Sequence, residues 1–445
     1  MISIMILIVY DQDFLDIQDH ISYDFSYQRE VLITIKQSPG NGGAGGKLPM
    51  VSASKGERCA RMKAGHHGVF YELILFGFFL ASKLMRHKAH LLGRENLSHI
   101  PTPVIFALTH DSYFEVPSLS RIYYALKPRP DFMVMVKNDF LSGRYLSTNY
   151  GKKNKFLRNI LLMIDKSGLP LAIFHKLKVV AIDRPFVDVF SKKKEELRQE
   201  ISDQLSRFRD SSMQGISTLI FPEGTTWGYG GLKKIRSSVY QVLETTFQST
   251  GRRVYILPIN VKVDRLMKGA KDVFIRIGPP VFFRKSKDEF NQTLFELLQQ
   301  LHTITFSQVA AYYLKRLAET KQDTARTVIF RKELFLQNLE GILADMNRLT
   351  SDRILPGFDP DLLNRRYLSH KVERFLKYCL KRQYLQKKRF NNQKEALLLD
   401  IERILSSHTI KEFRKANPLG FCANELTSLG EQTVRSLFDA RLCFR

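Results

Sequence analysis

Cysteine is scarce in this chain. Four cysteines, Cys59, Cys379, Cys422 and Cys443, occur in 445 residues, and no two of them form a Cys-x-x-Cys pair. Disulfide scaffolds and structural zinc sites need closely spaced cysteines, so the sequence indicates neither class. A reducing compartment is therefore the default expectation.

Long apolar runs are also scarce. Residues 1–9 are apolar but have no basic lead-in and no cleavage site, so we do not interpret them as a signal peptide. Residues 69–84 carry Glu72 and are fewer than the roughly 20 that a spanning helix needs. Four basic residues follow this run directly: Arg86, His87, Lys88 and His90. The pattern predicts a helix that lies on an anionic membrane surface, with a buried core helix as the alternative.

Acidic residues are outnumbered by basic ones. The 69 Lys and Arg against 44 Asp and Glu give a net charge of +25, which indicates an anionic partner without naming it. Phospholipid surfaces, nucleic acid, acyl carrier protein and phosphorylated substrates all qualify. The 44% hydrophobic content and the length are those of a folded protein with one large domain and an additional segment.

Residues 1–65 differ from the rest of the chain. They include a glycine-rich tract at 40–46 and then mostly polar residues, so we expect a poorly ordered N-terminal extension. Whether residues 1–61 are part of the native protein stays open, because Met62 could be a later start. The spacing Gly40-x-Gly42-x-x-Gly45 matches a dinucleotide-binding pattern, but no helix follows it readily, and a flexible linker accounts for it better.

Residues 66–304 alternate short β-rich runs with helical segments, which predicts an α/β domain. The predicted strands are 104–108, 132–136, 178–182, 216–221, 254–261 and 273–277. Apolar residues at helical spacing predict a helix over 191–210. From 305 to 445 helical periodicity takes over, so we expect an α-helical C-terminal region. Its basic stretch at 381–389 is either a solvated helix face or an added membrane or partner contact.

The first chemically distinctive segment follows the predicted strand 104–108. His110 precedes Glu115 by five positions, and a carboxylate one turn along a helix can hold one ring nitrogen of a histidine. The other nitrogen can then take a proton from a hydroxyl, as a general base does. A structural histidine is the common alternative for this segment alone. Asp111 is a second carboxylate candidate.

Two further strand ends carry candidate residues. Arg184 follows the strand 178–182, and its planar guanidinium matches phosphate oxygens, although an ion pair with Asp183 is the simpler alternative. The strand 216–221 runs into Pro222-Glu223-Gly224-Thr225. A turn explains the proline and the glycine, whose N–H can approach a ligand closely, but it does not explain Glu223.

Two more segments add to this set. Lys233 and Lys234, with Arg236, fall on what reads as the next helix and could complement a phosphate, although a basic run is more often solvated. Pro258 interrupts the strand 254–261, which suggests an edge, a bulge or a bend near a binding surface.

Taken in order, these segments resemble the motifs of the glycerolipid acyltransferase family, which includes the 1-acylglycerol-3-phosphate acyltransferases. His110 and Glu115 match its His-x4-Asp/Glu motif, and Ile182-Asp183-Arg184 matches its second motif. The third motif, Phe-Pro-Glu-Gly-Thr, is complete at 221–225, and the apolar-Pro-apolar fourth motif is at 257–259.

The resemblance covers about residues 85–280, and three departures stand out. Glu115 replaces the usual aspartate, Thr109 stands where asparagine is usual, and the Lys-Gly pair after the third motif is missing.

The resemblance implies an α/β fold with a central mixed β-sheet flanked by helices, preceded by an N-terminal amphipathic or apolar helix. It implies that His110 is the catalytic base, oriented by Glu115 or by Asp111. Arg184, with Glu223 and Thr225, would bind the substrate phosphate, while the Gly224 amide could also donate to the oxyanion. Lys233 and Lys234 are additional candidates. No metal and no cofactor are expected, because acyl-CoA or acyl carrier protein serves as the co-substrate.

The implied reaction moves a fatty acyl group to the hydroxyl of a phosphate-bearing glycerolipid, with 1-acylglycerol-3-phosphate as the first choice. Glycerol 3-phosphate or another lysophospholipid is the alternative acceptor. We expect association with the cytoplasmic face of an anionic phospholipid membrane, a role in phospholipid biosynthesis, and no nucleic-acid partner. The rival hypotheses are a non-catalytic basic membrane-binding protein and a nucleic-acid-binding protein.

Overall fold

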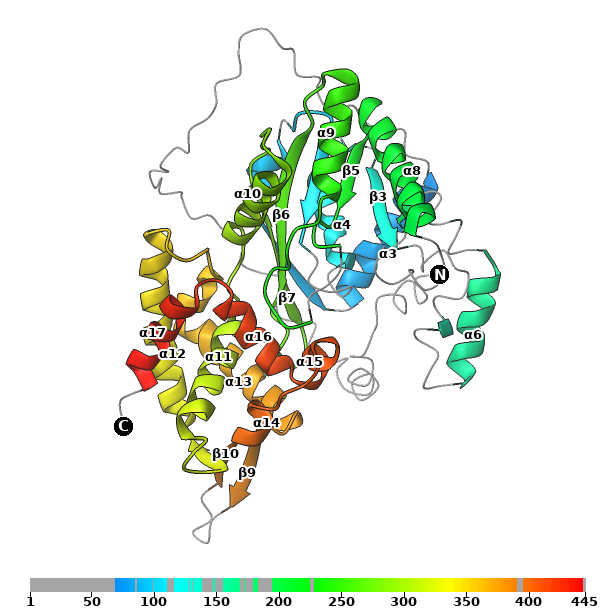
Figure 1. Ribbon diagram of the computed structural model, residues 1–445. Coiled ribbons are helices and arrows are strands. Elements are labelled where there is room, and N and C mark those ends of the chain that lie inside the picture. Colours follow the sequence, from blue (N-terminus) through cyan, green and yellow to red (C-terminus); the bar gives the residue numbers. More distant parts are fainter. Residues whose placement is uncertain are drawn as a thin grey trace, which may run out of the picture.

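The computed structural model describes residues 69–84, 86–98, 100–109, 116–127, 129–130, 132–137, 147–148, 155–168, 172, 179–182, 194–224, 228–389 and 395–442. The predicted extension at 1–65 and its glycine-rich tract lie outside these residues. Within them, a large sheet carries helices on both faces, and a mostly helical C-terminal region packs beside it (Figure 1).

The large sheet has seven strands in the order β1-β7-β6-β2-β5-β3-β4. Their bounds are β1 His87–Leu92, β2 Val104–Leu108, β3 Phe132–Lys137, β4 Val179–Ile182, β5 Ser217–Ile220, β6 Tyr255–Val263 and β7 Lys271–Ile277. All neighbouring pairs are parallel except β6 and β7, so the predicted mixed sheet is confirmed.

Six of these strands match the predicted ones, whereas β1 was not predicted. Its first residue, His87, is 5% exposed and shares a hydrogen bond with Ser118 Oγ. The interpretation of His87 and His90 as the basic flank of a membrane helix is therefore wrong, because both lie in an edge strand of the sheet. Arg86 and Lys88 remain exposed.

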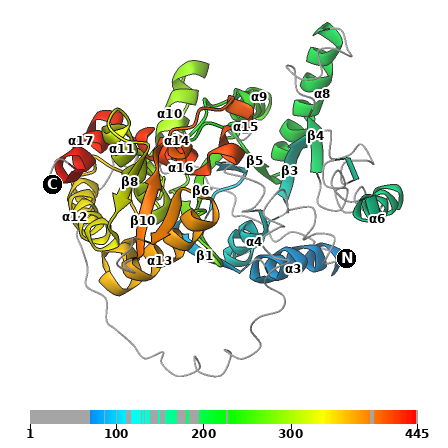
Figure 2. The same cartoon turned by 90° about the horizontal axis from the view of Figure 1, so that it is seen from below.

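Helices cover both faces of the sheet. Successive side chains of β2 point to opposite faces, and all of them are buried, so both faces need a covering layer. Phe106 and Leu108 pack with side chains of α3 (Val69–Leu84) and α4 (Val116–Ala125). Ile105 and Ala107 face the other layer. That layer contains α8 Lys194–Met213, α9 Ser238–Thr250 and α10 Lys287–Gln300, of which α8 matches the predicted helix at 191–210 (Figures 1 and 2). The short η1 Arg94–Leu97 follows β1, and α6 Lys155–Lys166 lies apart from both layers.

Pro258 lies inside β6, which is an interior strand between β7 and β2. The expectation of a sheet edge at this proline is therefore wrong. Regular pairing of β6 with β7 stops at Ile259 and Ile277 and continues only as a single bridge between Ile256 and Val281. Proline has no N–H to donate, and the gap in this ladder accommodates it.

The C-terminal region contains helices and a second, three-stranded antiparallel sheet of order β8-β10-β9. The helices are α11 Phe306–Lys321, α12 Lys332–Ser351, η4 Pro360–Leu363, α13 Arg365–Lys381, α14 Ile401–Ile404, α15 Ile410–Ala416, α16 Pro418–Thr427 and α17 Glu431–Leu442. The strands are β8 Thr327–Phe330, β9 Leu385–Arg389 and β10 Glu395–Asp400. The purely helical prediction is thus corrected: α13 ends at Lys381, and most of the basic stretch 381–389 forms a strand.

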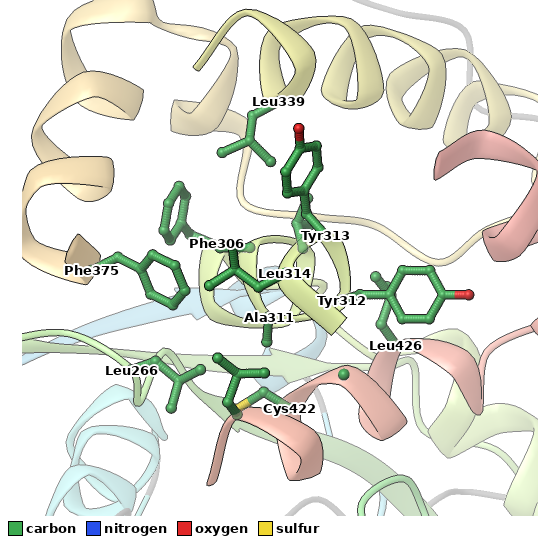
Figure 3. Close-up of a cluster of buried hydrophobic side chains, with 14 of the residues drawn as sticks. Leu266, Phe306, Ala311, Tyr312, Tyr313, Leu314, Leu339, Phe375, Cys422 and Leu426 are labelled. Carbon is green, nitrogen blue, oxygen red and sulfur yellow. The ribbon is translucent and has the colours of Figure 1, made fainter. Parts of the chain in front are cut away.

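The C-terminal helices enclose a large apolar core around α11 (Figure 3). Phe306 and Leu314 of α11, Phe375 of α13 and Cys422 of α16 meet there, and Leu266 joins them from the chain that follows β6. Burying a leucine of this kind contributes about 1.5–3 kcal/mol. The core therefore ties the C-terminal region to the end of β6.

Candidate active site

The four motif segments follow or occupy strands that run in the same direction. In the row β6-β2-β5-β3-β4 every neighbouring pair is parallel, so the carboxyl ends of these strands lie at one edge of the sheet. Open α/β sheets bind ligands at this edge. The predicted site residues His110, Asp111, Glu115, Arg184 and Thr225 follow these strands in the sequence but lie outside the described residues. Their contacts remain predictions.

Thr109 fixes the end of β2 directly before His110. Its N–H donates to the carbonyl of Ile259 at 3.0 Å, and its Oγ1 accepts from the N–H of Val261 at 2.8 Å. The threonine side chain is 3% exposed. Thr109 stands where the family that the sequence resembles usually has asparagine. Its hydroxyl therefore links the chain to β6 by a hydrogen bond directly before the first motif.

Glu223 is buried in the turn that ends β5, with 3% exposure. Its Oε2 accepts from the backbone N–H of Lys233 at 2.9 Å. The turn itself is closed by the N–H of Gly224, which donates to the carbonyl of Phe221 at 2.9 Å, and Gly224 has a φ of +70°. Positive φ favours glycine, so the third motif needs this residue for its turn.

Residues 232–236 run beside the third-motif turn. Arg236 N–H donates to the carbonyl of Pro222 at 2.7 Å, which adds a second backbone contact to that of Lys233. The prediction that Lys233 and Lys234 lie on a helix is wrong, because α9 begins only at Ser238. Burial, followed by the charge of Arg236, lowers the pKa of Lys233, although Glu223 opposes the shift. Lys234 is exposed.

A small cavity of about 30 Å³ brings Thr109 and Glu223 together. The rest of its wall comes from β6, from α10 and the residues after it, from the loop at 231–232 and from α16 and the residues after it: Asn260, Lys262, Phe295, Gln299, His302, Gly231, Leu232, Phe421, Glu425, Ser428 and Leu429. A cavity needs about 10–15 Å³ for one water molecule, so this one has room for water but not for a lipid acceptor.

In the wall of this cavity, only one of the two polar side-chain atoms of Asn260 has a hydrogen-bond partner among the described residues. Its Nδ2 donates to the carbonyl of Leu298 at 2.7 Å, whereas its Oδ1 is buried and has no hydrogen-bond partner among the described residues. A buried acceptor without a partner costs about 1–3 kcal/mol, so a water molecule would be favourable there.

A buried ion pair closes the C-terminal side of the cavity. Lys262 Nζ lies 2.7 Å from Glu425 Oε1, and the two side chains are 8% and 2% exposed. Gln308 Nε2 donates to the other oxygen of Glu425 at 3.2 Å, and Gln308 Oε1 lies 3.2 Å from His302 Nε2. No motif in the sequence marks these residues. The one signal was a lone carboxylate, Glu425, in the otherwise uncharged α16.

Helix α3 has both buried and exposed apolar side chains. Ile74 and Ala81 are fully buried, whereas Phe76 and Leu84 are 53% and 58% exposed. Glu72 is paired with Arg129 at 3.3 Å. Among the described residues, no helix combines the length and the hydropathy that crossing a bilayer requires. Over the same residues, no three His, Cys, Asp or Glu side chains gather closely enough to hold a metal ion.

Comparison with known proteins gives one family match. Residues 90–262, from β1 to the end of β6, match the family model described as Acyltransferase. Among solved structures, the chain is similar to the 1-acyl-sn-glycerophosphate (LPA) acyltransferase PlsC from Thermotoga maritima, with 13% sequence identity and a TM-score of 0.32. That similarity covers 52% of this chain and 79% of the other. A search of curated proteins gave no match.

Proposed function

We propose that the protein transfers a fatty acyl group from acyl-CoA or acyl carrier protein to the hydroxyl of a phosphate-bearing glycerolipid, because residues 90–262 match the family model described as Acyltransferase. The preferred acceptor is 1-acylglycerol-3-phosphate, and glycerol 3-phosphate or another lysophospholipid is the alternative. The main support for the proposal is the match of residues 90–262 to the family model. Within this range, the motif segments follow or occupy parallel strands of the large sheet.

In the proposed reaction His110 takes the proton of the acceptor hydroxyl as its oxygen attacks the thioester carbonyl. Glu115 orients the imidazole, and Asp111 is the alternative carboxylate. The tetrahedral intermediate carries an oxyanion, for which the Gly224 N–H is a candidate donor. The carbon–sulfur bond then breaks, and His110 returns the proton to the leaving thiolate. The acyl group passes directly to the acceptor, without an acyl-enzyme.

The acceptor phosphate is assigned to Arg184 and Thr225, since a guanidinium and a hydroxyl both donate to phosphate oxygens. The structure supports a shaping role for Glu223, because its carboxylate holds the Lys233 backbone beside the third-motif turn. Lys233 and Lys234 follow this turn and add positive charge near the acceptor. In this proposal Arg184→Lys raises KM for the phosphorylated acceptor more than it lowers kcat.

Membrane association at the cytoplasmic face is part of the same proposal. The net charge of +25 and the exposed apolar residues of α3 favour an anionic lipid surface. A nucleic-acid-binding protein would share the charge. Binding to liposomes with anionic lipid, measured by sedimentation beside binding to RNA at the same salt, separates the two. Salt-sensitive liposome binding without RNA binding is the expected result, and the reverse contradicts it.

Acyl transfer itself is tested with the full chain in detergent. Acyl-CoA and acyl carrier protein are offered as donors, each with 1-acylglycerol-3-phosphate, glycerol 3-phosphate and a lysophospholipid without a free phosphate monoester. The proposal expects turnover that is fastest with 1-acylglycerol-3-phosphate. Absence of transfer to every acceptor, from a protein that still binds anionic liposomes, would overturn the enzyme and favour a non-catalytic membrane-binding relative.

A further inference from the structure

Helix α16 contacts two segments that follow acyltransferase motifs in the chain, through residues 163 and 195 positions earlier than its own. One is the carboxyl end of β6, which follows the fourth motif. The other is residues 228–231, here called the glycine loop, which come shortly after the third motif. Both segments help to line the cavity that also contains Thr109 and Glu223.

The glycine loop approaches α16 and its neighbour α15 closely. Asn424 Nδ2 donates to the carbonyl of Tyr229 at 3.0 Å, and the ring centroids of Tyr229 and Phe413 are 5.2 Å apart. At Gly230, which has a φ of +106°, a Cβ atom would lie only 2.6 Å from the carbonyl oxygen of Phe421. The loop can approach the helix backbone this closely only because Gly230 has no side chain.

The end of β6 is fixed from the same helix. Glu425 holds Lys262 through the buried ion pair, and β6 in turn holds Thr109 through two hydrogen bonds. Thr109 is bonded directly to His110 in the chain. A continuous series of contacts therefore runs from α16 through β6 to the segment that carries the proposed base. A buried charge pair is costly to form and has a defined geometry once formed, which suits it to fixing position.

From these contacts we infer that α16 belongs to the catalytic unit and positions the end of β6 and the glycine loop, with Glu425 and Asn424 as positioning residues. Glu425 fixes the end of β6, and Asn424 fixes the glycine loop beside the third-motif turn. The inference rests on the proposed function, because it gives the positioned segments a catalytic role. It assigns neither residue a contact with substrate.

Two variants test the inference without leaving a buried charge unpaired. The double variant Lys262→Met/Glu425→Gln removes both charges, and Asn424→Ala removes the donor to the glycine loop. The matched control is Arg316→Met/Asp439→Asn, which removes an ion pair of 2.7 Å between α11 and α17, within the C-terminal region.

Hydrogen–deuterium exchange of the full-length proteins provides a readout that needs no activity. Positioning predicts at least about tenfold faster amide exchange at residues 255–263 in the double variant and at 228–236 in Asn424→Ala. The control leaves both segments unchanged. Unchanged exchange in the test variants would overturn the positioning role.

Steady-state kinetics provide the second readout. Misplaced catalytic groups predict a kcat about 10- to 100-fold lower with KM values within a few-fold of wild type, because a displacement near 1 Å suffices for such a loss. The control keeps the wild-type kcat. Faster exchange with a wild-type kcat would refute the catalytic part of the inference. If the wild type itself transfers no acyl group, the proposed function fails, and the exchange result still decides whether α16 positions the two segments.

Discussion

Two buried ionic clusters join the large sheet to the C-terminal helices, and they differ in what else they contact. The Lys262–Glu425 pair lines the cavity beside Thr109 and Glu223. The second cluster, here called the Lys371 cluster, consists of Lys371, Asp264 and Asp272, and none of these three lines that cavity. Both clusters are buried, but the first pairs one cation with one carboxylate and lines the cavity, whereas the second pairs one cation with two carboxylates away from it.

The Lys371 cluster is satisfied almost completely by protein groups. Lys371 is 1% exposed, with its Nζ 2.5 Å from Asp264 Oδ2 and 2.7 Å from Asp272 Oδ2. Asp264 also accepts from the Ser307 N–H at 2.8 Å, and Asp272 lies 2.8 Å from His90 Nε2. Burial lowers the pKa of Lys371, but the two aspartates outweigh it and raise the pKa above its usual value. The Lys371 cluster therefore stabilises the interface between the sheet and the C-terminal helices, whereas we assign the Lys262–Glu425 pair the additional role of fixing the end of β6.

The largest predicted effect is on the free energy of unfolding, when the cation of the Lys371 cluster is removed. Lys371→Met leaves two buried aspartates without their cation, so we expect the free energy of unfolding to fall by about 3–5 kcal/mol. Chemical denaturation measures it. The control is Lys377→Met, an exposed lysine of the same helix, with an expected change within about 0.5 kcal/mol. Equal stability of the two variants would contradict the role of the cluster.

The second prediction concerns how the stability of the large sheet depends on pH through the buried His87. Burial, with the charge of Lys271 adding to it, lowers the pKa of His87 to about 4. The unfolded chain, with an ordinary histidine pKa, binds more protons between about pH 6.5 and 4, so acid destabilises the fold across this window. We expect a loss of about 2–3 kcal/mol there. His87→Asn, whose amide can replace the Nδ1 contact to Ser118, abolishes this loss.

Denaturation curves of wild type and His87→Asn at pH 7 and at pH 4.5 measure this difference. His408→Asn is the control, because His408 is exposed, and it should keep the wild-type acid sensitivity. An identical loss of stability in wild type and His87→Asn would refute the assignment.

The third prediction has the opposite sign and concerns the C-terminal side. Burial raises the pKa of Asp359 to about 6, although Lys371 opposes the shift. The folded protein then binds more protons than the unfolded chain between about pH 4 and 6, so stability falls as pH rises through this window. In Asp359→Asn the amide oxygen can still accept from the Asp361 N–H, while the NH2 group takes the place of Oδ2 and donates to the Tyr367 hydroxyl oxygen.

We expect Asp359→Asn to be more stable than wild type by about 1–3 kcal/mol at pH 8, with the advantage shrinking toward pH 4. Thermal or chemical denaturation across this range checks it. Asp352→Asn, which changes an exposed aspartate, should show no such pH-dependent gain. A gain that grows toward acid pH would contradict the prediction.

The smallest predicted effect concerns the membrane-facing role proposed for α3. Phe76→Ser removes a half-exposed aromatic side chain, and partial burial of phenylalanine in lipid corresponds to about 1–2 kcal/mol. Affinity for anionic liposomes should therefore fall about 5- to 30-fold, while the unfolding free energy is unchanged. Ile329→Ser is the control, since Ile329 is 58% exposed on β8, in the C-terminal sheet. Equal liposome affinity for both variants would remove α3 from the membrane contact.

Much of the sheet could be predicted because its interior strands are short apolar runs that end in turn residues. Val104–Leu108 is an example, since all five residues are buried and the predicted bounds are the observed ones. The edge strand His87–Leu92 was missed because three of its six residues are basic or histidine. Leu385–Arg389 was missed for a similar reason: three of its five residues are basic, which is also the composition of a solvated helix face.

The site could be predicted only where the chain itself carries a motif. Glu223 stood out because a turn explains the neighbouring proline and glycine but not the carboxylate. The pairing of Lys262 with Glu425 could not be predicted from the sequence, because the two residues are 163 positions apart. The sequence around an isolated charged residue does not indicate which residue it pairs with. Which distant charges meet depends on how the C-terminal helices pack, and periodicity does not determine that packing.

The most direct test of the central claim compares steady-state acyl transfer by wild type and His110→Ala in detergent, with the preferred donor and acceptor. We expect kcat to fall by about 10²- to 10⁴-fold in the variant, because a general base contributes this much, while its unfolding free energy stays at the wild-type value. An active wild type whose rate survives the loss of His110 would contradict the claim that this edge of the sheet carries out the reaction through that histidine.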